Sequence, residues 1–255
     1  MAGIFEGIDD LIDRSLRVTQ IGTTAPHYRH KATALSLTSK PYSFDAFVLF
    51  DNIVKRMHKN WSAAHDLNPR SPSEENWRWE KKPDISENNE SNEKLWEKAI
   101  AICCGEEWVN QVPTASGLLD GSSEKHCNID LVHRIAPEEF EFIELKYASD
   151  TPLFAAFEIL KYGLLYVFSR RYAEQLGYSG VSKEILGARL VHLRVVAPYE
   201  YYGYFPRKPD WFQKEINGGL NCLALDGYRM DFGFEYMGQA TDGDVCSAVA
   251  NRKPV

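Results

Sequence analysis

Signature motifs of several common enzyme families are absent from this sequence of 255 residues. It contains no glycine-rich phosphate loop, no Gly-x-Ser-x-Gly nucleophile elbow and no His-Glu-x-x-His zinc motif. The sequence therefore does not indicate a P-loop NTPase, an α/β-hydrolase or a zinc protease of the common types. It also shows no internal repeat, so a repeat architecture is not predicted.

Cysteine is scarce and shows no motif spacing. The five cysteines are Cys103, Cys104, Cys127, Cys222 and Cys246. Because the count is odd and no Cys-x-x-Cys occurs, the sequence predicts neither a disulfide framework nor a zinc ribbon. We therefore expect a reducing, cytoplasmic compartment.

Long apolar runs and excess positive charge are missing as well. No run approaches the roughly 20 residues that cross a bilayer, and the first ten residues do not resemble a signal peptide, so we expect no membrane partner. A net charge of −7 argues against strong non-specific binding to nucleic acid, because such binding depends on many phosphate contacts. The net charge does not exclude a local basic groove. A hydrophobic content of 44% is typical of a globular chain with a substantial core.

Two short apolar stretches, each interrupted by charged residues, lie close together in the middle of the chain. Residues 128–133 and 140–146 are predicted to be strands, and Pro137 lies in the turn between them. Side chains alternate between the two faces of a strand, so one face of this hairpin is expected to be apolar. The residues expected on that apolar face are Ile129, Leu131, Ile143 and Leu145.

The other face of the hairpin is expected to bring three charged side chains together. With the turn centred on Pro137, Asp130 falls opposite Glu144, and Lys146 shares their face. Like charges directly opposite each other destabilise a sheet, so this pair requires a compensating cation. Lys146 supplies one positive charge, and the hard carboxylate oxygens suit Mg²⁺ or Mn²⁺. The alternative is an exposed hairpin with a charged solvent face, but apolar neighbours on both faces favour a central, covered strand.

The pattern Asp-x13-Glu-x-Lys, on adjacent strands and followed by a helix, resembles the PD-(D/E)XK nuclease superfamily over about residues 93–198. The resemblance implies that Asp130, Glu144 and the carbonyl of Leu145 hold the metal, and that Lys146 positions or activates the attacking water. It also implies an α/β (α+β) fold with a restriction-endonuclease-like core, in which helices flank a central mixed β-sheet. An isoleucine precedes the aspartate where the family has a nominal proline.

Two predicted helices flank these strands. The helix from Glu93 to about residue 104 carries Glu97, which the resemblance places near the metal, although a surface position is the alternative. The helix predicted over 152–176 carries Glu158, Lys161 and Tyr162 on one face. Glu158 and Tyr162 match the spacing of a Gln-x-x-x-Tyr motif in the exonuclease branch of the superfamily. They imply a further site carboxylate and, with Lys161, contacts to nucleic acid; a buried Glu158–Lys161 ion pair is the alternative.

The remaining segments are predicted from periodicity and composition. Helices are expected over 3–18, 43–64 and 210–217, and further strands over 109–119, 189–197 and 230–237. Ser43 is expected to cap the second helix. Trp77 and Trp79 lie in a polar stretch at 68–92, where they either fix a long loop to the core or stack on bases. Arg207 and Lys208 follow a tyrosine-rich run that either binds nucleic acid or packs on the sheet.

These observations predict an N-terminal helical region and linker over 1–90, a nuclease-like core over 91–240, and a frayed tail over 241–255. The function that this organisation predicts is a Mg²⁺- or Mn²⁺-dependent nuclease that hydrolyses phosphodiester bonds. DNA is the expected partner rather than RNA, and a homodimer is left open as the assembly. The alternative is a catalytically inactive protein of this fold that acts as an interaction or nucleic-acid-binding module.

Overall fold

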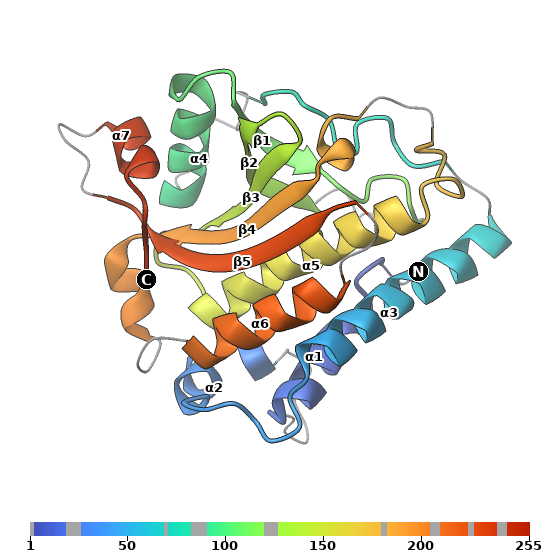
Figure 1. Ribbon diagram of the computed structural model, residues 1–255, viewed down its shortest axis with the longest axis horizontal. Coiled ribbons are helices and arrows are strands. Elements are labelled where there is room, and N and C mark those ends of the chain that lie inside the picture. Colours follow the sequence, from blue (N-terminus) through green and yellow to red (C-terminus); the bar gives the residue numbers. More distant parts are fainter. Residues whose placement is uncertain are drawn as a thin grey trace.

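A mixed six-stranded β-sheet lies at the centre of the protein (Figure 1). The computed structural model describes residues 3–18, 27–68, 71–82, 91–119, 127–179, 183–204, 210–223, 227–238 and 244–255. The strands are β1 (Trp108–Pro113), β2 (Asn128–Ala136), β3 (Glu139–Leu145), β4 (Leu190–Ala197), β5 (Arg229–Tyr236) and β6 (Lys253–Pro254), and they follow one another in this order across the sheet. β3, β4 and β5 run parallel, and the other neighbouring strands are antiparallel. β2 and β3 therefore lie inside a mixed sheet, as predicted.

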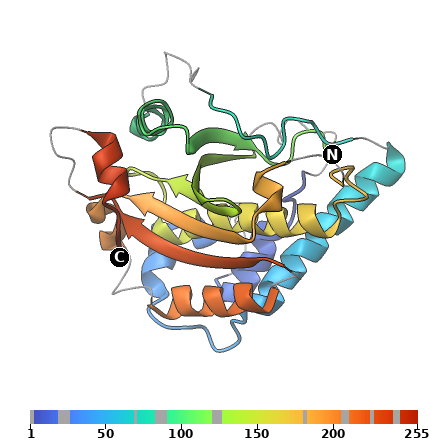
Figure 2. The same ribbon diagram turned by 45° about the horizontal axis from the view of Figure 1, so that its top comes forward.

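Helices cover both faces of this sheet. One face is covered by α5 (Pro152–Arg171) and α6 (Asp210–Leu223), with α1 (Ile8–Leu16) and α3 (Ala46–Leu67) outside them. The opposite face carries α4 (Asn92–Cys103) and α7 (Val245–Ala250), which share a smaller apolar cluster with β2 and β3. Figure 2 shows these two layers on opposite sides of the strands. The short helix α2 (Lys31–Ser36) lies beside the larger layer.

The central helix α5 owes its position to its caps and its apolar surface. The hydroxyl of Thr151 accepts a hydrogen bond from the amide of Phe154 at 3.2 Å, and Pro152 follows in the first turn. Length and apolarity would suit a membrane span, yet 83% of the most apolar 18-residue window is buried inside the protein. A Cβ atom on Gly163 would lie 2.5 Å from Leu193, so the helix packs on β4 more closely than alanine would allow.

The loop that follows α3 is attached to the core of the sheet through Trp77. Trp77 is fully buried, and its ring packs against Phe142 of β3 and Tyr166 of α5. This contact confirms that Trp77 fixes the loop after α3 to the core. Helix α3 is capped by Asp45, whose carboxylate accepts from the amide of Val48, so the prediction of Ser43 as its cap is wrong.

The C-terminal end differs most from the prediction. Residues 244–255 form α7 and β6, and β6 pairs with β5, so the expected frayed tail is not found in the described part of this segment. Cys104 at the end of α4 is joined to Cys246 in α7 by a disulfide, with the two Cα atoms 5.2 Å apart. The prediction that no disulfide links these elements is therefore wrong. The two cysteines lie 142 residues apart in the sequence, so no local spacing could have revealed the pair.

Candidate active site

The predicted hairpin register places Asp130 and Glu144 at the same end of β2 and β3. Val132 pairs with Phe142 and Leu131 with Ile143, and Asp130 and Glu144 are the next residues beyond this last pair. The amide of Leu145 donates to Oδ2 of Asp130 at 3.2 Å. This end of β3 is its carboxyl end, where β4 also ends.

The strand pleat is interrupted at Asp130. Gln111, its neighbour on β1, has a φ of 48°, a left-handed conformation that residues other than glycine adopt rarely. Ile129 belongs to the larger core while Leu131 packs in the smaller cluster on the opposite face, so the prediction that they share a face is wrong. Asp130 and Gln111, the two residues at this irregularity, both form hydrogen bonds with side chains on α4.

Lys146 lies between two carboxylates. Its Nζ atom is 2.8 Å from Oε1 of Glu144 and 2.8 Å from Oε2 of Glu158 on α5. The side chain of Lys146 is only 8% exposed. Burial opposes its charge, but Glu144, Glu158 and Asp130 outweigh burial and hold the pKa of Lys146 above its ordinary value. Lys146 is therefore a fixed cation at the end of β3.

Burial favours the protonated forms of Glu144 and Glu158. Burial, followed by the charge of Asp130, raises the pKa of Glu144 well above its ordinary value, and Lys146 opposes that rise. Burial likewise raises the pKa of Glu158, which Lys146 partly offsets. This end of the sheet therefore holds more carboxyl groups than Lys146 alone can neutralise, and burial favours the protonated forms of Glu144 and Glu158.

A second lysine, which sequence reasoning missed, bridges the remaining two acids. Nζ of Lys94 lies 2.5 Å from Oε2 of Glu97 and 3.2 Å from Oδ1 of Asp130. Lys94 stands three residues before Glu97 on α4, and this i,i+3 spacing was the only signal of the pair in the sequence.

Glu97 is buried, not on the surface as the alternative interpretation required. It is 1% exposed and accepts hydrogen bonds from the side chains of Asn110 and Gln111 at 3.1 and 3.0 Å. Burial and then the charge of Asp130 raise the pKa of Glu97 to about 7, against the lowering effect of Lys94. A carboxyl group with this pKa gains or loses its proton near neutral pH.

The residues expected to contact nucleic acid have different surroundings. Nζ of Lys161 lies 3.5 Å from a carboxylate oxygen of Asp9 on α1, and the ring of Tyr162 packs edge-on against Phe5. Burial and the nearby Glu144 raise the pKa of the Tyr162 hydroxyl, which places this residue beside the acids. Glu158 forms its ion pair with Lys146 of β3, at 2.8 Å. Arg207 and Lys208 lie outside the described residues.

The acids and the carbonyl of β3 fit a hard divalent cation by their chemistry, since all of the donors are oxygens. No group of three His, Cys, Asp or Glu side chains converges as a ready metal-binding set within the described ranges. The four acids are instead paired with two lysines, Glu97 and Asp130 with Lys94, and Glu144 and Glu158 with Lys146. A metal at Asp130 would compete with the Lys94 ammonium for Oδ1.

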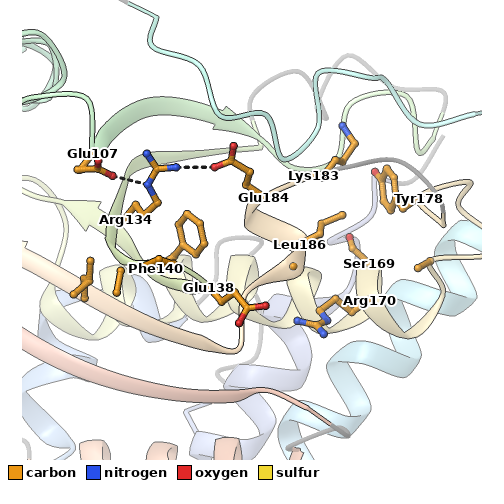
Figure 3. Close-up of a pocket in the computed structure, with 15 residues that line it drawn as sticks. Glu107, Arg134, Glu138, Phe140, Ser169, Arg170, Tyr178, Lys183, Glu184 and Leu186 are labelled. Atoms are coloured by element: carbon orange, nitrogen blue, oxygen red, sulfur yellow. Dashed lines mark hydrogen bonds and ion pairs between the residues drawn. The ribbon is translucent and has the colours of Figure 1, made fainter.

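A cleft of about 1140 Å³ lies elsewhere, at the turn end of the β2–β3 hairpin. Figure 3 shows that Arg134 there reaches toward Glu107 on one side and Glu184 on the other. These ion pairs measure 2.5 and 2.8 Å, so Arg134 is already paired with two carboxylates. A large cleft is the default position for a ligand site, but the unbalanced carboxylates at the other end of the hairpin are the stronger chemical signal.

Comparisons with protein families, with curated proteins and with solved structures find no match to this chain.

Proposed function

We propose that this protein is a Mg²⁺- or Mn²⁺-dependent nuclease with a restriction-endonuclease-like core. The observation that carries the proposal is the buried Lys146, held at 2.8 Å from both Glu144 and Glu158 beside Asp130. The element order α4–β1–β2–β3–α5–β4 is the order that the sequence resemblance implies, and it supports the same assignment. The cluster also lies at the carboxyl ends of parallel strands, where ligands commonly bind in open α/β sheets.

In this proposal Asp130, Glu144 and the carbonyl of Leu145 hold the metal, with Glu97 as a further carboxylate beside Asp130. When bound, the metal supplies positive charge that polarises the scissile phosphate and lowers the pKa of a coordinated water. Lys146 orients the attacking water through its Nζ atom and offsets negative charge that develops on the phosphate. Glu158 fixes the position of that Nζ atom from α5. Glu97, with a pKa of about 7, exchanges a proton near neutral pH.

The test is cleavage of labelled single- and double-stranded DNA and RNA in Mn²⁺ by wild type, Lys146→Met and Asp130→Ala. We expect Lys146→Met to keep metal binding and to lose roughly two to four orders of magnitude in rate, typical for one positioned proton-transfer or electrostatic group. Asp130→Ala should abolish metal binding, measured by calorimetry, while circular dichroism shows an intact fold. We expect DNA to be cleaved in preference to RNA.

Lys40→Met is the matched control, because Lys40 forms a surface ion pair with Glu215 on α6 at 2.6 Å, outside the acidic cluster. It should cleave at the wild-type rate. Equal rates for wild type and Lys146→Met would assign the activity to a contaminant or to another site.

One observation favours a second candidate function, a catalytically inactive protein that binds nucleic acid or another partner through this fold. The two lysines neutralise part of the acidic cluster without any metal, and burial raises the pKa of Glu97 and Glu144, so the cluster is stable in their protonated forms. A calorimetric titration with Mn²⁺ separates the two functions, because only the nuclease requires binding that Asp130→Ala removes. The cytoplasm stays the proposed location only if Cys104 and Cys246 are reduced in the cell, since disulfides are rare in reducing compartments, and a homodimer is the proposed assembly to test.

A further inference from the structure

A second cleft, of about 770 Å³, opens at the same edge of the sheet as the acidic cluster. The carboxyl ends of β4 and β5 form its floor, and the parallel pairing of β3, β4 and β5 aligns these ends with the end of β3. The lining side chains that matter here are Trp96, Tyr199, Glu200, Tyr236, Met237 and Lys253. Its volume lies within the range of about 300–1,000 Å³ that is common for small-ligand sites.

The cleft adjoins the candidate active site through two aromatic residues. Trp96, which lines the cleft, immediately precedes Glu97 on α4. Its ring meets the ring of Tyr147 edge-on, with the centroids 5.0 Å apart. Tyr147 directly follows Lys146 and is 39% exposed. An aromatic surface therefore leads from the cleft to the residue beside the catalytic lysine of the proposed nuclease.

Tyr199 is exposed in this cleft without an evident structural need. It is 65% exposed, and within the described ranges its ring packs edge-on against Tyr236, at 5.2 Å between ring centroids. Two other tyrosines of the same 3₁₀ segment (Tyr199–Tyr204), Tyr201 and Tyr202, are buried. The hydroxyl of Tyr202 donates to backbone carbonyls of β4 and β5 at 2.9 and 2.8 Å, so it already anchors the segment. The Tyr199 ring is left available for a ligand.

The charges near the cleft favour a stacked base over a duplex backbone. Its charged lining residues, Glu200 and Lys253, have opposite signs, and the net charge of the chain is −7. Lys94, Lys146 and Lys161 are each paired with a carboxylate, so these three cations are not free to make the phosphate contacts that bind a duplex. Aromatic stacking needs no excess positive charge and accepts any base.

We infer that this cleft binds unpaired bases of a single-stranded nucleic acid, by stacking on Tyr199 and its aromatic neighbours. The inference rests on the proposed function for the position of the phosphate, because Trp96, which lines the cleft, directly precedes Glu97 of the acidic cluster. Binding itself requires neither metal nor cleavage, so it is measured separately.

The experiment is fluorescence anisotropy with a labelled 12-nucleotide single strand, as DNA and as RNA, and with the matching DNA duplex, all in EDTA. We expect the single strand to bind more tightly than the duplex, and Tyr199→Ala to weaken it by about 5- to 150-fold, which corresponds to the loss of one base–aromatic stack. Tyr199→Phe keeps the ring and should bind within about twofold of wild type. Tyr42→Ala is the matched control, since Tyr42 is 96% exposed, precedes α3 and is not among the residues that line the cleft.

The outcomes distinguish this inference from the proposed function. Equal binding by wild type and Tyr199→Ala, tighter binding of the duplex, or no binding of any oligonucleotide overturns the inference, even if the protein cleaves DNA in Mn²⁺. Weakened binding by Tyr199→Ala with rescue by Tyr199→Phe supports the cleft, even if no cleavage is detected and the proposed nuclease activity fails. Comparison of the DNA and RNA strands identifies which sugar the site accepts.

Discussion

Replacement of Glu97 by glutamine should make the protein less sensitive to pH. The side chain is 1% exposed, and its pKa is raised from 4.5 to about 7 by burial and then by Asp130. Between these two pKa values the native state binds a proton that the unfolded state has lost, so Glu97 stabilises the fold at low pH. That contribution is lost as the pH rises from about 5 through 7. Glutamine keeps the shape of the side chain and removes the titration.

The magnitude follows from linkage. The rise in pKa from 4.5 to about 7 corresponds to about 3 kcal/mol at the limit, and most of this falls between pH 5 and pH 8. We therefore expect the free energy of unfolding of wild type to fall by about 2–3 kcal/mol more than that of Glu97→Gln over this interval. Urea denaturation of both proteins at pH 5 and pH 8, followed by circular dichroism, measures the difference.

The control for this experiment is Glu106→Gln, because the side chain of Glu106 is 89% exposed and its loss should leave the pH profile of wild type unchanged. Parallel pH profiles for wild type and Glu97→Gln would refute the reasoning, since they would mean that Glu97 takes up no additional proton in the folded state. A Glu97→Gln protein that is more stable than wild type at pH 8 would indicate that the glutamate is retained at a cost in stability, as expected of a site residue.

Two further predictions concern the lysine and the disulfide that the sequence did not reveal. Lys94→Met should bind Mn²⁺ more tightly than wild type in calorimetry, because it removes the ammonium that lies 3.2 Å from Oδ1 of Asp130; equal or weaker binding would contradict a shared position for metal and ammonium. Thiol titration of the denatured, unreduced protein should give two fewer thiols than after reduction, because Cys104 and Cys246 are joined; equal counts would instead agree with the reducing compartment that the sequence indicated.

The sequence by itself determined the features that depend on neighbouring residues. The short turn around Pro137 was sufficient to bring Asp130 and Glu144 to the same end of the hairpin, and the pairing of Leu131 with Ile143 agrees with that placement, although strand alternation fails between Ile129 and Leu131. Helix α5, which has a proline in its first turn, was predicted from its composition in the same way, although it ends at Arg171 rather than near residue 176. These features follow from rotation and rise per residue within one element or across one hairpin, where side-chain positions repeat with a fixed period.

The tertiary structure decided every feature that joins distant segments. Helical spacing placed Glu158 and Lys161 on one face, but packing of α5 against β3 brought Glu158 to Lys146 instead. The burial of Glu97 depends on β1, whose Asn110 and Gln111 satisfy its oxygens. Such partners are selected by how helices and strands stack, and the free energy of that stacking is shared among many side chains across the core. Short patterns in the sequence do not reveal these contacts between distant segments. The full set of charged residues at the site could therefore be identified only in the folded protein.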